Sequence, residues 1–174
     1  MNTIHVKSWV SCAAFFGALF FSTVVFAALI EVKLEVDAAN SKLKVISNDR
    51  PCDGPTDSCI NVKKNSAPFI KFTLTEACMT GTNIDYQLTG VRISLIEKVW
   101  PTASNPLNEL VAKDFKADPE TGEIKFGGNN EKKDYILKFK NRNSHGYTVY
   151  YEVSAEPCKA NSNLDDIFLD PEIR

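Results

Sequence analysis

Ile30-Glu31-Val32-Lys33-Leu34-Glu35-Val36-Asp37 alternates apolar and charged residues without a break. A period of two places the apolar side chains on one face of a β-strand and the charged ones on the other. The stretch therefore predicts a half-buried strand, which we expect at the edge or on the outer side of a sheet.

Similar alternation recurs through the rest of the chain. Turn residues such as Asp118-Pro119-Glu120-Thr121-Gly122 separate the alternating stretches, because proline presets one dihedral angle and glycine accepts a positive one. Glu109–Phe115 fits either a helical turn or a strand, and we favour a strand. About seven to nine short strands without a convincing amphipathic helix predict an all-β fold, a β-sandwich. The other stretches from which these strands are drawn are Leu43–Ile46, Phe69–Thr75, Ile84–Leu88, Val91–Leu95, Glu123–Phe126, Tyr135–Lys140, Tyr147–Ser154 and Ile167–Leu169.

The N-terminal stretch has the order of a secretory signal peptide. Lys7 precedes an uncharged run from Ser8 to Ile30, and Val25-Phe26-Ala27 offers small side chains at the −3 and −1 positions of a cleavage site. We expect residues 1–27 to be removed and the mature chain, 28–174, to be secreted or periplasmic. The alternative is an uncleaved anchor, since the run over residues 8–30 is long enough to span roughly 30 Å of hydrocarbon and tether the protein to a membrane.

The cysteine count fits an oxidising compartment. Cys12 leaves with the signal, and the remaining four can all pair, in any of three connectivities. We favour Cys52–Cys59, whose loop contains glycine and proline, together with Cys78–Cys158. The spacings contain no C-x-x-C pair, which disfavours zinc.

Composition limits the classes of partner. The mature chain has 147 residues, enough for a single hydrophobic core. The signal carries one lysine and no acidic residue, so 19 basic and 22 acidic side chains remain, a net charge of −3. We see no basic stripe, and we expect no nucleic-acid partner.

Catalytic signals are weak. His145 is the only histidine of the mature chain and lies in the predicted turn Asn143–Gly146. A Ser-His-Asp triad needs a histidine held by a carboxylate and touching a nucleophile, which a turn tip does not favour. We therefore predict no catalytic residue and no cofactor; a hydrolase that uses two carboxylates is the alternative.

The acidic tail resembles a calcium loop in part. Asn161, Asn163 and Asp165 stand at alternate positions and Glu172 follows eleven residues after Asn161, which makes these four the candidate calcium ligands. The loop carries Asp166 where glycine is required at its sixth position, so we favour no metal site.

Two aromatic features raise the question of ligand binding. Trp100 follows a predicted strand and enters a proline-rich loop, so it is either a stacking platform for a sugar or a core residue. On the strand Tyr147–Ser154, Tyr147 and Tyr151 share one face and Tyr150 points to the other. Tyr150 therefore has the position of an interface residue.

Three stretches carry a family resemblance. They are Phe168-Leu169-Asp170-Pro171-Glu172-Ile173-Arg174, Tyr135-Ile136-Leu137-Lys138-Phe139-Lys140-Asn141 and Asp85-Tyr86-Gln87-Leu88-Thr89. Together they resemble the bacterial DP-EP family of small proteins. The resemblance covers the last ninety residues, 85–174, and implies a single immunoglobulin-like β domain with no assigned activity. We predict one β-sandwich domain over residues 28–174.

These features favour an exported, non-enzymatic protein that acts by surface contact with an unknown protein or glycan. An edge strand such as Ile30–Val36 offers unpaired backbone groups for such contact. The alternatives are a carbohydrate- or calcium-dependent binding module, a membrane-tethered β domain and a carboxylate hydrolase.

Overall fold

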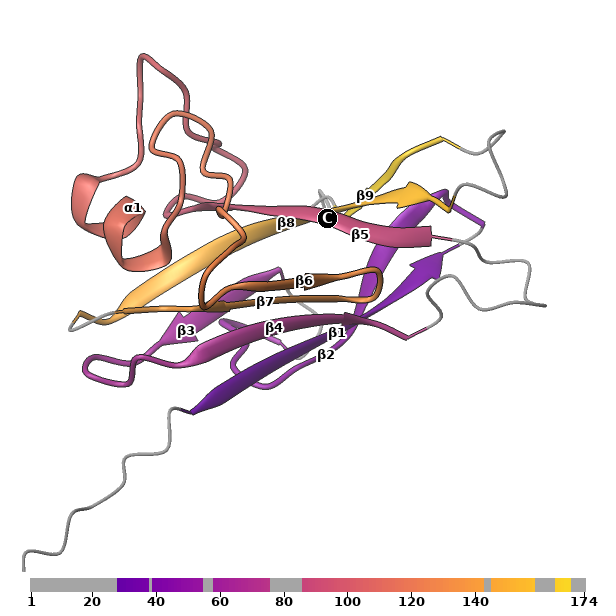
Figure 1. Cartoon of the computed structure of the whole chain (residues 1–174), viewed down its shortest axis with the longest axis horizontal. Helices are drawn as coiled ribbons and strands as arrows, with labels where there is room; N and C mark the ends of the chain where they lie inside the picture. Colours follow the sequence, from indigo (N-terminus) through magenta and orange to yellow (C-terminus); the bar gives the residue numbers. More distant parts are fainter. Residues whose placement is uncertain are drawn as a thin grey trace, which may run out of the picture.

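The computed structural model describes residues 28–37, 39–54, 58–75, 86–142, 145–158 and 165–169. These ranges contain nine strands in two sheets and one short helix, α1 (Glu109–Phe115), so the all-β prediction is confirmed. Figure 1 shows the two sheets face to face, with α1 and its neighbouring loops at one end.

The larger sheet has five strands in the order β2-β1-β4-β7-β6. All neighbours are antiparallel except β1 and β4, which run parallel. Every second residue of the longer strands is buried, as the alternation predicted, because one face of the sheet packs against the other sheet. The strands are β1 (Leu29–Asp37), β2 (Lys42–Asn48), β4 (Phe69–Leu74), β6 (Glu131–Lys133) and β7 (Ile136–Lys140).

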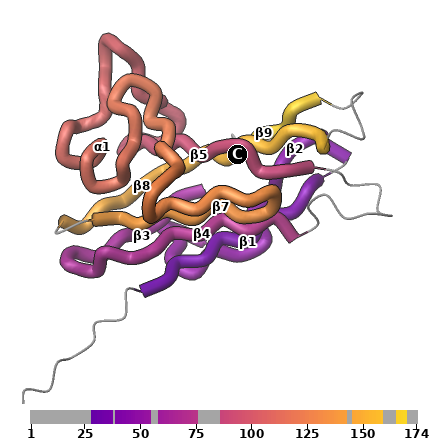
Figure 2. The backbone as a smooth tube through the Cα atoms, in the orientation of Figure 1, coloured from indigo at the N-terminus to yellow at the C-terminus, as the bar shows by residue number. Residues whose placement is uncertain are grey.

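The smaller sheet has four strands arranged around its longest one. β8 (Tyr147–Pro157) pairs with β5 (Tyr86–Ser94) on one side and with β3 (Cys59–Val62) and β9 (Ile167–Leu169) on the other. Figure 2 shows β9 at the end of the sandwich away from α1, close to β2. The sequence patterns did not predict β3 or β6, both of which are short.

The prediction that Ile30–Asp37 forms an edge or outer strand is wrong. β1 pairs with β2 through Val32–Asp37 and with β4 through Leu29–Leu34, so it has a neighbour on each side. Its charged face is the solvent face of an interior strand. Alternation reports that one face is buried, and it carries no information about how many neighbouring strands there are.

Two predicted strands, Ile84–Leu88 and Val91–Leu95, belong to one element. The described part is β5, which contains an irregularity between Leu88 and Gly90 in its pairing with β8. A β-bulge adds one residue, so the buried positions change from even to odd numbers there. Leu95 lies beyond the strand end and is exposed.

The prediction of a strand over Glu109–Phe115 is also wrong. Asn108 caps the helix because its side chain accepts a hydrogen bond from the Leu110 amide at 3.0 Å. The buried residues are Val111, Ala112 and Phe115, a spacing that fits a helical face. Lys116 ends α1 in the left-handed conformation.

The segment Glu123–Phe126 forms isolated bridges instead of the predicted strand. Its backbone hydrogen-bonds to β5 where Ile124 N donates to Val91 O at 2.9 Å, and to the chain after α1 where Lys125 N donates to Lys116 O at 3.0 Å. The segment thus changes neighbours after a few residues and never forms a regular ladder.

A cluster of aromatic side chains joins the two sheets and α1. Tyr151 on β8 packs edge-on against Phe72 on β4, with the ring centroids 4.8 Å apart. Phe139 on β7 lies between Phe72 and Phe115 of α1. Phe72, Tyr151 and Phe115 are fully buried, so this cluster is the centre of the core.

Candidate functional site

The free edge of β5 is covered by three backbone groups. Leu88 N donates to Asp134 O, Ile124 N donates to Val91 O and Ile93 N donates to Gly122 O, at 2.7–2.9 Å. A partner strand therefore finds no continuous row of unpaired groups along β5.

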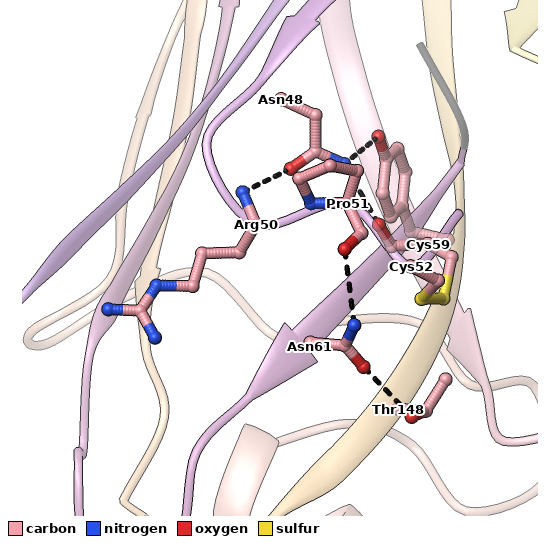
Figure 3. The surroundings of a disulfide bond; sticks show 8 residues. Asn48, Arg50, Pro51, Cys52, Cys59, Asn61 and Thr148 are labelled. Carbon is pink, nitrogen blue, oxygen red and sulfur yellow. Dashed lines mark hydrogen bonds between the residues drawn. A yellow bond between two sulfur atoms is a disulfide. The ribbon is translucent and has the colours of Figure 1, made fainter. Parts of the chain in front are cut away.

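The edge of β3 is covered by the chain that leads into it. Asn61 N donates to Arg50 O at 2.9 Å, and the Asn61 side chain donates to Pro51 O at 3.1 Å (Figure 3). A disulfide between Cys52 and Cys59, whose Cα atoms lie 5.6 Å apart, holds this chain in place. The pair is the one that the loop composition favoured.

The two outer strands of the larger sheet are charged. β6 is the three-residue stretch Glu131-Lys132-Lys133, exposed throughout, and β2 carries Lys42 and Lys44. A very short strand, as in β6, and lysine side chains, as in both strands, are typical of edges that resist pairing. The expected contact through a strand edge therefore has little support at β5, β3, β2 and β6, and the sheet faces are the alternative contact surfaces.

A groove of about 500 Å³ lies on the outer face of the smaller sheet. Its floor comes from β5 and β8, and it is bordered by the segment Glu123–Phe126 beside β5 and by Phe168 of β9 beside β8. The residues that line it are Thr89, Gly90, Val91, Arg92, Glu123, Ile124, Phe126, Glu152, Ser154 and Phe168. We call this surface the groove face.

Cross-strand polar pairs form the floor of the groove face. The Thr89 hydroxyl donates to the Ser154 hydroxyl at 2.8 Å, and Arg92 pairs with Glu152. Beyond the groove the row continues, since the Gln87 amide donates to Glu156 at 2.7 Å. These side chains alternate with the buried residues of β5 and β8, which is why they lie on the outer face.

Arg92 is held on two sides. Its Nη2 donates to Glu152 Oε2 at 2.8 Å, and Nε lies 2.7 Å from Oε1 as an ion-pair contact. Nε is buried, and its N–H lacks a well-aligned hydrogen-bond acceptor among the described atoms. The guanidinium group also stacks over the Trp100 ring, 4.4 Å from its centroid. Glu152 and Trp100 thus hold the planar group in one orientation.

Two phenylalanines line the groove. Phe168 lies between the buried Ile167 and Leu169 of β9, so its side chain points outward and is 46% exposed. It pairs across the strands with Ser154. Phe126 packs partly against the core and supplies apolar surface on the side of the Glu123–Phe126 segment.

The other predicted candidates do not come together as a site. His145 lies 3.8 Å from Asp114, but its side chain is 54% exposed. The Tyr147 hydroxyl donates to the same carboxylate at 3.2 Å; burial, with a smaller effect of Asp114, raises the pKa of Tyr147. This cluster ties α1 to β8. Tyr151 is buried and Tyr150 lies on the opposite face, as the alternation predicted.

The calcium candidates fall mostly outside the described residues. Asn161, Asn163 and Glu172 lie there, and Asp165 is exposed just before β9. The described ranges contain no group of three potential metal ligands. The predicted signal peptide and Cys78 also lie outside, while Cys158 is disulfide-bonded. In the same ranges, no helix has the length and apolar character to cross a bilayer.

No protein-family model matches the chain, and comparisons with curated proteins and with solved structures find no match either.

The groove residues were not predicted as a site. Trp100 was considered for sugar stacking, and the structure places it beside the groove through Arg92. Phe168 carried a usable signal, because it is the outward position of a three-residue strand. Glu123 and Phe126 carried none, since their neighbours are set by the path of the chain after α1.

Proposed function

We propose that this protein is exported, is not an enzyme, and acts by binding a partner on its groove face. The observation that carries the proposal is the pairing of Arg92 with Glu152 across β5 and β8, in a groove that the exposed ring of Phe168 also lines. Binding sites commonly combine a few fixed polar groups with apolar surface. The covered and charged strand edges support a face over an edge as the contact surface.

We further propose an immunoglobulin-like sandwich related to the DP-EP family. Strands that alternate between the two sheets support this assignment: β1 and β2 belong to the larger sheet, β3 to the smaller, β4 to the larger and β5 to the smaller. Such connections are typical of immunoglobulin-like sandwiches. The Cys52–Cys59 disulfide is compatible with a periplasmic or extracellular location.

A carboxylate hydrolase is the competing function, because Glu123 and Glu152 both line the groove. Both oxygens of Glu152 contact Arg92, however, so the carboxylate is engaged in orienting the guanidinium. This arrangement favours binding over proton transfer. When the protein is incubated with a ligand that it binds, we therefore expect to recover the ligand chemically unchanged.

Site-specific photocrosslinking tests the proposed function. A benzophenone amino acid in place of Phe168, in the full chain made in its native host, is expected to crosslink to a macromolecule. The matched control places the same group at Phe69, on the outer face of the larger sheet. Equal crosslinking at both positions, or crosslinking at Phe69 only, would refute the groove face as the contact surface.

Export is tested by the mass of the protein recovered from the envelope or medium. We expect the mass of residues 28–174, lowered by about four hydrogens if both cysteine pairs are oxidised. A mass that includes residues 1–27 would support the membrane-anchored alternative, and free thiols would contradict the oxidising compartment.

A further inference from the structure

We propose that the groove face binds an uncharged glycan, with one sugar ring against Phe168 and its hydroxyls on Arg92, Ser154 and Thr89. This inference rests on the proposed function and names its ligand class. The groove, about 500 Å³ in volume, is large enough for small-ligand or sugar-sized occupants.

The polar groups match a ligand that both donates and accepts hydrogen bonds. Glu152 engages Nε and Nη2 of Arg92, which leaves the Nη1 amino group and one Nη2 hydrogen as donors within the described structure. The Thr89 hydroxyl donates to Ser154 and the Ser154 hydroxyl donates to Gly90 O at 3.3 Å, so both oxygens keep lone pairs that can accept hydrogen bonds from a ligand. Neighbouring hydroxyls of a sugar ring fit such a planar, two-pronged donor beside hydroxyl groups.

The apolar groups match the C–H face of a sugar ring. Phe168 is 46% exposed and lies across from Ser154, so ring and hydroxyl border the same space. When the C–H face of the sugar packs on the Phe168 ring, this apolar surface is removed from water. The hydroxyls at the edge of the sugar ring can then reach the floor of the groove.

Charge argues against an anionic ligand. Among the described residues that line the groove, Arg92 is the one cation and Glu123 and Glu152 are the two carboxylates, which gives this lining a net charge of −1. The backbones of Glu123 and Arg92 form an isolated antiparallel β-bridge, so the two side chains lie on the same, outer face. Sulfated or phosphorylated polymers need clustered cations, and this surface provides the opposite balance.

Backbone hydrogen bonding argues against an extended peptide. A peptide that adds to a sheet uses unpaired backbone groups, and the β5 edge beside the groove is already bonded to Gly122, Ile124 and Asp134. The floor of the groove offers side chains instead. A ligand rich in hydroxyl groups fits this surface better than a β-strand does.

The structure provides its own reporter of binding. Trp100 is the only tryptophan of residues 28–174, and its ring contacts the Arg92 guanidinium at 4.4 Å. A ligand that engages Arg92 is expected to change the fluorescence of Trp100. The probes are cellohexaose, laminarihexaose and N-acetylchitohexaose, with a heparin hexasaccharide and a Gly-Ser peptide of similar length as comparisons.

At least one neutral probe is expected to shift Trp100 fluorescence saturably and to give binding heat in calorimetry. Phe168→Ala is expected to raise its dissociation constant about tenfold or more, as for a central aromatic anchor. Phe168→Tyr keeps the ring and is expected to bind, whereas Phe168→Leu keeps only the apolar character and is expected to bind weakly. The matched control is Tyr135→Ala, because Tyr135 is 48% exposed and lies outside the groove.

Thermal melting separates lost binding from lost folding, since Phe168→Ala and Tyr135→Ala are expected to melt like the parent chain. The inference is overturned if no neutral probe binds, if heparin or the peptide binds better, or if Phe168→Leu binds as well as the parent. A photocrosslink from position 168 to a protein would refute the glycan as the ligand and would leave the proposed binding function of the groove face in place. Absence of any crosslink there would refute both.

Discussion

Arg92 illustrates how single residues determine the groove face. Its outward position follows from the bulge between Leu88 and Gly90, which changes the phase of β5. Glu152 and Trp100 then hold the guanidinium in place. Without the extra residue, position 92 would point to the core, so one irregular position decides which side chain reaches the groove.

Gly122 is predicted to be intolerant of a side chain. Its φ is +75°, and a Cβ would collide with the Ile93 carbonyl oxygen, which lies in the backbone that Gly122 helps to cover. We expect Gly122→Ala to lower the free energy of unfolding by about 2 kcal/mol or more, measured by urea denaturation.

Gly54→Ala is the control for that variant. A Cβ at Gly54 has no neighbour within 4 Å among the described atoms. We expect Gly54→Ala to change the free energy of unfolding by no more than about 0.5 kcal/mol. Equal effects of the two substitutions would contradict the close approach of Gly122 to Ile93.

Glu31 is predicted to make stability depend on pH. A hydrogen bond from Lys71 at 2.7 Å is the main cause that lowers the pKa of Glu31, and burial opposes it. Because its pKa is lowered in the folded state, ionised Glu31 stabilises the protein at pH values above its unfolded pKa near 4.5. This stabilisation is lost as the pH falls through the pKa of the folded state. We expect Glu31→Gln to cost about 0.5–1 kcal/mol at neutral pH.

The difference in unfolding free energy between Glu31→Gln and the parent chain is expected to vanish at acidic pH, where Glu31 is protonated. Glu97→Gln is the control, because its carboxylate is 56% exposed and lies 4.0 Å from Lys98. Denaturation curves at several pH values measure both. A penalty for Glu31→Gln that persists in acid would mean that shape, and not charge, is responsible.

At the scale of elements, α1 shows why a seven-residue segment is hard to assign. Glu109–Phe115 contains apolar residues that fit a short strand as well as a helical turn. The helix is decided by its ends, which are Asn108 at the N-cap and Lys116 at the C-cap, and by the burial of Phe115 against Phe139. So short a helix depends on these contacts more than on intrinsic propensity.

Asn108→Ala is expected to destabilise the protein by about 1 kcal/mol, because the Leu110 amide loses its acceptor. Asn108→Asp keeps an acceptor at the same position and is expected to be close to neutral. Chemical denaturation followed by circular dichroism measures both variants. Equal losses for alanine and aspartate would show that capping is not the cause.

For the whole molecule, the contact between the two sheets is predicted to dominate stability. Phe72 is fully buried against Tyr151 and Phe139, whereas Phe69 on the same strand faces outward beneath Lys138 and Lys140. We expect Phe72→Ala to cost about 3–5 kcal/mol. Phe69→Ala is the matched control and is expected to cost at most about 1 kcal/mol.

Phe72→Leu refines this test because it retains most of the apolar volume. We expect a cost of about 1–2 kcal/mol, measurable even if Phe72→Ala unfolds completely. Urea denaturation followed by Trp100 fluorescence reports all three variants. A larger loss of unfolding free energy for Phe69→Ala than for Phe72→Ala would contradict the assignment of the Phe72 face of the larger sheet to the core.

The sequence by itself determined the all-β class and most of the strands, because period-two burial is a local property of each stretch. Ile30–Asp37, Phe69–Thr75 and Tyr147–Ser154 were all predicted in this way. Tertiary structure alone decided that β1 is interior, that Glu109–Phe115 is helical, and that Arg92, Glu152, Ser154 and Phe168 share one groove. The physical reason is that strand neighbours, short helices and sites are set by contacts between residues far apart in the chain, which local alternation does not encode.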